Sequence, residues 1–222
     1  MPRVGRCVMP SRPTAGGSKL IAAKSSLRVL SFLKGRKVMI SSNQREENYQ
    51  EYLRLLSDSD YIEVTYDEQS GGVSAIHHEH KFDKQLGPYG YRRGDYERKV
   101  TTVLREKGHR VLLSAERSVE NVKNNDGFLD DLSMDIKTVE SDGAWSISSK
   151  LRDAEKQGAQ VVVLYFPDSA LYSKERVLDG IGKYESNPQI QASGAITDCL
   201  VIVCDQIVDH IKKTTTPSAE WF

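Results

Sequence analysis

The sequence lacks any apolar run long enough to cross a membrane or to form the core of a secretory signal. It contains three cysteines, Cys7, Cys199 and Cys204, an odd set without a repeated metal-ligand spacing. It also lacks net charge, since 31 Lys and Arg balance 31 Asp and Glu. We therefore expect a cytoplasmic protein without a membrane partner, with reduced thiols and without an overall attraction to polyanions.

The composition that is present is that of a globular protein. Of 222 residues, 38% are hydrophobic and 28% are charged, which excludes a disordered or fibrous chain. The charge is distributed unevenly, because the first forty residues hold nine Lys and Arg and no Asp or Glu. We interpret residues 1–43 as a basic leader, either a nucleic-acid-binding arm or a flexible extension, and residues 214–222 as a loose tail.

Residues 44–88 are predicted to form a small N-terminal module of one helix and one hairpin. Residues 44–56 have apolar side chains at helical spacing and end at a polar Ser-Asp-Ser run. Residues 61–66 and 73–80 alternate like strands on either side of a glycine pair, as in a hairpin. A run rich in glycine and proline at 87–90 marks the end of this module, because it suits neither helix nor strand.

From residue 94 onward, helical and strand periods alternate regularly. The predicted order is α-β-β-β-α-β-α-β, with elements at 95–107, 110–114, 127–129, 134–139, 146–157, 160–166, 173–184 and 199–204. Ser146 or Ser148 is expected to cap the second of these helices, which ends at Gly158. Helices between apolar strands favour an α/β fold, with a mixed sheet flanked by helices over residues 89–213.

Two aspartates are predicted to face each other across a hairpin. If the two short strands turn tightly at Asp130 and Asp131, the register places Asp126 directly opposite Asp135. Their Cβ atoms then lie about 4.5 to 5.5 Å apart, which is destabilising for two carboxylates without a neutralising charge. A hard cation such as Mg²⁺ or Mn²⁺ would supply that charge, so the pair is a candidate metal cradle. The alternative is an ordinary polar turn, since Asn-Asn-Asp-Gly is itself a turn sequence.

Two further side chains are placed beside this pair by periodicity. Lys137 shares a strand face with Asp135, where an ammonium can orient a metal-held water or stabilise charge on a phosphate. Glu97 borders the apolar stripe of the helix at 95–107, an expensive position for a carboxylate unless a cation or donor meets it. Its expected position in the first helical turn, where the helix dipole favours an acid, is the alternative explanation.

These residues resemble the PD-(D/E)xK nuclease superfamily. Asn125-Asp126-Gly127 followed by Met134-Asp135-Ile136-Lys137, after a helix that carries Glu97, looks like its motif, with Asn125 in place of the motif's proline. The resemblance implies an αβββαβ restriction-endonuclease-like core. It also implies that Glu97, Asp126 and Asp135 bind Mg²⁺ or Mn²⁺, and that Lys137 assists the attacking water.

A narrower resemblance concerns toxins. The GDYE run at 94–97, the KGHRV run at 107–111 and Gln157 are similar to the C-terminal tRNA-nuclease domains of contact-dependent growth-inhibition toxins; similar domains occur in phage and mobile-element proteins. This implies an endonuclease, a hydrolase acting on tRNA or DNA, with an immunity protein as a further partner. Such relatives sometimes take their lysine from elsewhere, so Lys150 or Lys156 is an alternative to Lys137.

Basic residues near the first helix are candidate phosphate contacts, with a solvated basic face as the alternative. These candidate nucleic-acid-binding residues are Arg92, Arg93, Arg98 and Lys99. Gln157 and Lys150 are expected on the side of the following helix nearest the proposed cradle.

Histidines offer a different chemistry. The densest imidazole cluster comprises His77, His78, Glu79, His80 and Asp83. It suggests a Zn²⁺ site, a histidine for RNA cleavage or a solvated hairpin edge. A metal-independent RNase of the barnase and EndoU kind would use His80 or His109 with a lysine. A non-catalytic structural protein of a phage or mobile element is the remaining hypothesis. The sequence predicts no oligomeric state.

Overall fold

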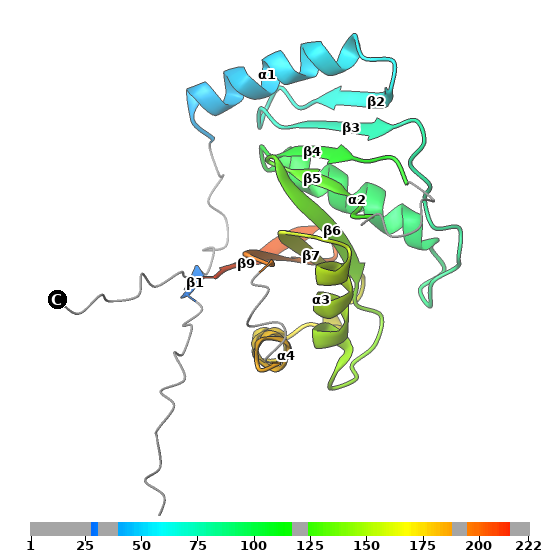
Figure 1. Cartoon of the computed structure of the whole chain (residues 1–222), viewed down its shortest axis with the longest axis vertical. Coiled ribbons are helices and arrows are strands. Elements are labelled where there is room, and N and C mark those ends of the chain that lie inside the picture. Colours follow the sequence, from blue (N-terminus) through cyan, green and yellow to red (C-terminus); the bar gives the residue numbers. More distant parts are fainter. Residues whose placement is uncertain (1–27, 31–39, 117–123, 188–194, 214–222) are drawn as a thin grey trace, which may run out of the picture.

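The computed structural model describes residues 28–30, 40–116, 124–187 and 195–213 (Figure 1). They form one nine-stranded sheet with the strand order β1-β9-β8-β7-β6-β5-β4-β3-β2. Most of the predicted basic leader, with Cys7, and all of the predicted tail lie outside these residues.

Nine strands and four α-helices make up this part of the chain. The strands are β1 (Arg28–Leu30), β2 (Tyr61–Tyr66), β3 (Val73–His77), β4 (Arg110–Leu113), β5 (Gly127–Leu129), β6 (Leu132–Thr138), β7 (Val161–Phe166), β8 (Asp198–Val203) and β9 (Gln206–Lys212). The helices are α1 (Ser42–Leu56), α2 (Arg93–Glu106), α3 (Ser146–Lys156) and α4 (Lys174–Glu185), with a 3₁₀ turn, η1 (Ser169–Leu171). From α2 to β8 the order of helices and strands is the predicted one.

The sheet is mixed. The pairs β3–β4, β6–β7 and β7–β8 are parallel, whereas the remaining neighbours are antiparallel. Parallel neighbours need a crossover, and α2, α3 and α4 each lie within one of these connections. The prediction of an α/β fold with a mixed sheet flanked by helices is therefore confirmed.

Each face of the sheet carries a hydrophobic core. Alternate residues of β7 beginning at Val161 join the core beneath α2, with Val100 and Leu104 of that helix. The intervening residues, beginning at Val162, join the core beneath α3 and α4. Figure 1 shows α2 behind the sheet and α3 in front of it. Because β7 is buried on both faces, its unbroken apolar sequence is explained by position.

The N-terminal segment extends this same sheet. The β2–β3 hairpin joins the sheet through the parallel pair β3–β4, and α1 packs on it through the fully buried Leu55 against Val73 and Ala75. The buried Asn48 of α1 donates hydrogen bonds to the carbonyl oxygens of Gly71 (2.9 Å) and Gly108 (3.1 Å). These contacts tie the helix to the loops that precede β3 and β4.

The hairpin between β5 and β6 has the predicted register. Gly127 pairs with Met134 and Leu129 with Leu132. Asp130 and Asp131 have φ values of 48° and 72°, the left-handed conformation that a two-residue turn of type I′ requires at both positions. This turn fixes which residues of the two strands oppose each other.

Some boundaries differ from the predictions. Strands β1 and β9 were not predicted; β9 falls within a segment interpreted as the end of the core, and β1 within the basic leader. Neither Ser146 nor Ser148 caps α3, because Trp145 occupies the N-cap position and makes no side-chain capping bond. β9 contains few apolar residues, and they do not alternate regularly with polar ones. The period-2 pattern that predicts a strand is therefore weak in this segment.

Candidate active site

The structure brings the two predicted aspartates together at the open end of the β5–β6 hairpin. Asp126 directly precedes β5, and Asp135 lies in β6 one position beyond Met134, the partner of Gly127. One oxygen of Asp126, Oδ2, accepts a hydrogen bond of 2.6 Å from the backbone N–H of Ile136. The register argument is therefore confirmed as geometry, and Asp126 is fixed beside the strand that carries Asp135.

Asp135 is the most unusual side chain of the site. Its exposed fraction is 0%, and neither carboxylate oxygen accepts a well-directed hydrogen bond. Lys137 Nζ lies 2.7 Å from Asp135 Oδ2, close in distance but poorly oriented. Burial, and then the negative charge of Asp126, raise the pKa of Asp135 to about 7 despite the opposing effect of Lys137. The Asp135 carboxylate therefore has the ammonium of Lys137 beside it but no well-directed hydrogen-bond donor.

Lys137 is held on the other side by α3. Its Nζ donates a hydrogen bond of 2.6 Å to Gln157 Oε1, at the C-cap of α3. Lys150 lies about two turns before Gln157 on the same face of α3. Burial lowers the pKa of Lys150, the nearby Glu140 opposes this and the charge of Lys137 adds to it. Gln157 and Lys150 therefore lie on the side of α3 that faces β6, as predicted. Lys156 instead is exposed and pairs with Asp153.

Glu97 approaches Asp126 from the opposite helical layer. Its carboxylate is 3.1 Å from His80 Nε2, and His80 Nδ1 lies 2.7 Å from the carbonyl oxygen of Ser114. Burial raises the pKa of Glu97, the hydrogen bond from His80 opposes this, and the charge of Asp126 adds to the rise. Burial lowers the pKa of His80, but its bonds to Glu97 and Ser114 outweigh this and the pKa is raised.

One part of the prediction for Glu97 is wrong. Since α2 begins at Arg93, the acid in its first turn is Asp95, and Glu97 lies beyond that turn. The helix dipole therefore does not explain a half-buried carboxylate at this position. His80 is the group that meets it, a contact that sequence spacing across 17 residues could not reveal.

In the described residues, the carboxylate oxygens of Glu97, Asp126 and Asp135 do not all lie within 4.8 Å of one another. A set of at least three His, Cys, Asp or Glu ligand atoms within 4.8 Å of one another occurs there once, at Asp60, His77 and His78. Glu97 is drawn toward His80, and Asp126 toward the backbone of Ile136. The cradle thus consists of the opposed pair Asp126–Asp135, with Glu97 near enough for the charge of Asp126 to raise its pKa.

The four predicted nucleic-acid-binding residues differ in whether an acidic side chain already pairs with them. Arg93 forms an ion pair of 2.8 Å with Glu140, and Arg98 forms one with Glu63 while its guanidinium lies 4.1 Å from the centre of the Phe82 ring. Lys99 lies 4.7 Å from the centre of the Tyr91 ring. Arg92 is exposed at the N-cap of α2. Within the described part of the chain, Arg92 and Lys99 form no ion pair, whereas Arg93 and Arg98 each already pair with a glutamate.

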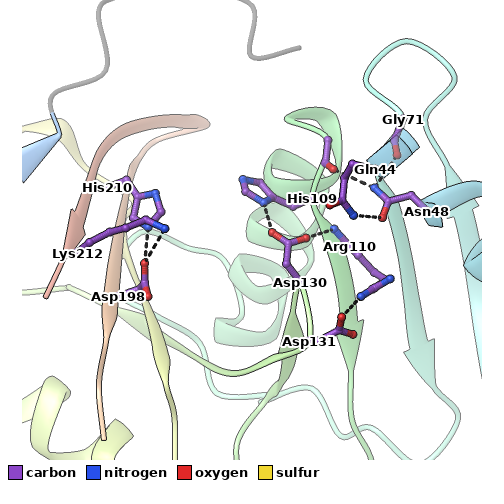
Figure 2. A network of polar contacts seen from close by, with 11 residues as sticks. Gln44, Asn48, Gly71, His109, Arg110, Asp130, Asp131, Asp198, His210 and Lys212 are labelled. Atoms are coloured by element: carbon purple, nitrogen blue, oxygen red, sulfur yellow. Dashed lines mark hydrogen bonds and ion pairs between the residues drawn. The ribbon is translucent and has the colours of Figure 1, made fainter. Parts of the chain in front are cut away.

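His109, one of the two histidines considered for the alternative RNase hypothesis, lies elsewhere. Figure 2 shows it at the turn end of the β5–β6 hairpin, where its Nδ1 is 2.6 Å from Asp130 Oδ2 and Arg110 contacts both Asp130 and Asp131. A second polar group in the same view joins β8 to β9 through Asp198 and His210. These contacts are distant in the fold from the open end of the hairpin, and they stabilise the sheet.

Comparisons with protein-family models, with curated proteins and with solved structures give no match. Among the described residues, no helix combines the length and the hydropathy needed to span a bilayer. Cys199, which is buried, and Cys204, which is exposed, are both free thiols.

Proposed function

We propose that the chain is a Mg²⁺- or Mn²⁺-dependent endonuclease of the PD-(D/E)xK type, with a restriction-endonuclease-like core formed by α2, β4, β5, β6, α3 and β7. The observation that carries this proposal is the opposed pair Asp126–Asp135 with the ammonium of Lys137 2.7 Å from Asp135. An ordinary polar turn would not explain a fully buried aspartate and a lysine inside strand β6.

The donor set fits a hard divalent cation. Both oxygens of Asp135 are buried without a well-directed donor, and a second carboxylate faces them across the hairpin. Mg²⁺ and Mn²⁺ prefer carboxylate oxygens, so Asp126 and Asp135 would hold the ion. Glu97, whose carboxylate contacts His80 in this structure, would be the third residue to hold the ion.

Each residue of the site then has a distinct task. When bound, the metal lowers the pKa of a water and neutralises charge that develops on the phosphate. Lys137, oriented by Gln157, binds the attacking water or a phosphate oxygen beside Asp135. Lys150, with its lowered pKa, is the second lysine within reach of this region.

The proposed substrate is nucleic acid, either tRNA or DNA. Of the four basic residues predicted to bind nucleic acid, Arg92 and Lys99 have no ion-pair partner in the described structure, and they would contact the phosphate backbone. The toxin-like or mobile-element role, a cytoplasmic site of action and an immunity partner belong to this proposal through the sequence resemblance.

The test is cleavage of a nucleic-acid panel by the purified chain. Labelled tRNA, single-stranded DNA and duplex DNA are incubated with Mg²⁺ or Mn²⁺, and parallel reactions contain EDTA. The proposal predicts cleavage of at least one substrate that EDTA abolishes and that Asp135→Asn lowers by about 100-fold or more. Cleavage that persists in EDTA contradicts the metal mechanism.

The histidine-based RNase remains a second candidate because His80 is oriented by Glu97 and by the carbonyl oxygen of Ser114. Both ring nitrogens face oxygen acceptors, so one of these contacts would have to open before His80 could act as a general base. Its side chain is only 2% exposed, which disfavours direct contact with RNA. His80→Ala would abolish such an activity, and Asp135→Asn would leave it largely intact. A chain that cleaves nothing with any metal, but folds normally, would instead support a structural protein.

A further inference from the structure

A second group of ligating side chains lies at the edge of the sheet. Asp60 directly precedes β2, His77 ends β3 and His78 follows it; one ligand atom from each of the three lies within 4.8 Å of the others. The antiparallel pairing of Tyr61 with His77 produces this convergence, since it brings the start of β2 beside the end of β3. Strand register therefore brings Asp60 to the two adjacent histidines, from which it is distant in the sequence.

His78 is prepared to bind a metal through one defined nitrogen. Its Nδ1 lies 3.1 Å from the carbonyl oxygen of Asp60, which can only accept, so Nδ1 carries the proton. The lone pair of a neutral imidazole is then on Nε2. An N–H that donates to a backbone carbonyl is the usual way in which a protein fixes the tautomer and the ring orientation of a histidine ligand. The backbone N–H of His78 donates to the same carbonyl at 2.8 Å.

His77 lies against His78 with its ring nearly parallel. The two ring centres are 4.7 Å apart and the planes differ by 22°. His77 Nδ1 accepts a hydrogen bond of 3.1 Å from the backbone N–H of Glu79, and coordination would replace this one bond.

We propose that Asp60, His77 and His78 bind one divalent transition-metal ion of the Zn²⁺ class. Two imidazole nitrogens and one carboxylate oxygen favour Zn²⁺, Co²⁺ or Fe²⁺ over Mg²⁺, which prefers oxygen ligands alone. Three protein ligands leave a fourth position for water or another small ligand. This site differs in ligand chemistry from the Asp126–Asp135 pair, and it does not depend on the proposed nuclease activity.

The ion would join the two outermost strands of one sheet edge. β2 is the last strand in the sheet order, and its pairing with β3 shifts between Ile62 and Thr65. A metal held by the residue before β2 and the residues at the end of β3 fixes the adjacent end of this hairpin. We therefore expect Zn²⁺ to raise the melting temperature of the full chain.

The experiment uses the full chain without an affinity tag, stripped with EDTA and then titrated with Co²⁺ and Zn²⁺. Visible absorbance of Co²⁺ reports nitrogen and oxygen coordination, and calorimetry gives the Zn²⁺ stoichiometry. We expect one ion per chain, with binding weakened by roughly tenfold or more in His78→Ala and in Asp60→Asn. Both side chains are exposed, so the melting temperature of these variants in EDTA should match that of the wild type.

Matched controls separate this site from other ligands. His109→Ala and His210→Ala remove histidines elsewhere in the sheet, and Asp135→Asn alters the candidate active site; all three should retain the Co²⁺ absorbance. A chain that shows no saturable Zn²⁺ binding overturns the proposal. So does wild-type affinity in both His78→Ala and Asp60→Asn, or a loss in His109→Ala equal to that in His78→Ala.

Discussion

Replacing Asp135 with asparagine should stabilise the metal-free protein while abolishing its proposed activity. Asp135 is fully buried, its oxygens lack well-directed donors, and the charge of Asp126 opposes its ionisation. Asparagine has nearly the same shape but carries no charge, so it removes the cost of ionising a carboxyl in this position. If the Asp135 carboxylate stabilised the fold, Asp135→Asn would be less stable than the wild type.

The magnitude follows from the raised pKa of Asp135, from 3.8 to about 7. A carboxyl whose pKa is higher in the folded state stabilises the protein below its unfolded pKa, and this contribution is lost as the pH rises through the folded pKa. At about 1.36 kcal/mol per pKa unit, the ionised carboxyl costs about 4 kcal/mol at neutral pH. For a domain of this size, the variant should melt roughly 8 to 16 °C higher.

The assay is thermal unfolding in EDTA from pH 4 to pH 8. The difference between Asp135→Asn and the wild type should be small near pH 4, grow as the pH rises and level off above about pH 7. Asp130→Asn is the matched control: despite burial, hydrogen bonds from His109 and the Arg110 backbone lower the pKa of Asp130, so this variant should be less stable. A destabilised Asp135→Asn would refute the reasoning.

Three further substitutions probe separate parts of the structure. Lys137→Met should lower cleavage by about 100-fold while keeping the shift in melting temperature that Mn²⁺ causes; a larger loss in Lys150→Met would reassign the catalytic lysine. Gly127→Ala should cost on the order of 3 kcal/mol in urea unfolding, because a Cβ there would lie 1.9 Å from the carbonyl oxygen of a β4 residue. Asp198→Asn should cost about 2 kcal/mol at pH 7, since the hydrogen bond from His210 holds the pKa of Asp198 at about 2; the difference should vanish as the pH falls through that value.

The sequence was sufficient to predict the order of elements from α2 to β8 because their apolar periods are strong. The register of β5 and β6 was also predictable, since two adjacent aspartates at the turn leave one tight hairpin that places Asp126 opposite Asp135. Lys137 followed from strand alternation alone. These inferences depend on local rules that act within a few residues.

The contacts that were not predicted are long-range. His80 meets Glu97 because the chain after β3 folds back against α2, and no local pattern encodes that approach. Asp60 approaches His77 and His78 through the pairing of β2 with β3, although the histidines alone had suggested a metal site. β9 escaped prediction because Asp209 and His210 interrupt its apolar positions, and its place in the sheet comes from pairing with β8 on one side and β1 on the other.

The central claim is that Asp126 and Asp135 together hold one hard divalent ion. Calorimetric titration of the full chain with Mn²⁺ tests it most directly, with Asp126→Asn, Asp135→Asn and Asp60→Asn titrated in parallel after Zn²⁺ has been removed. The account predicts a Mn²⁺ site in the wild type and in Asp60→Asn that both other variants lose. Equal Mn²⁺ binding by the wild type and Asp135→Asn would contradict it.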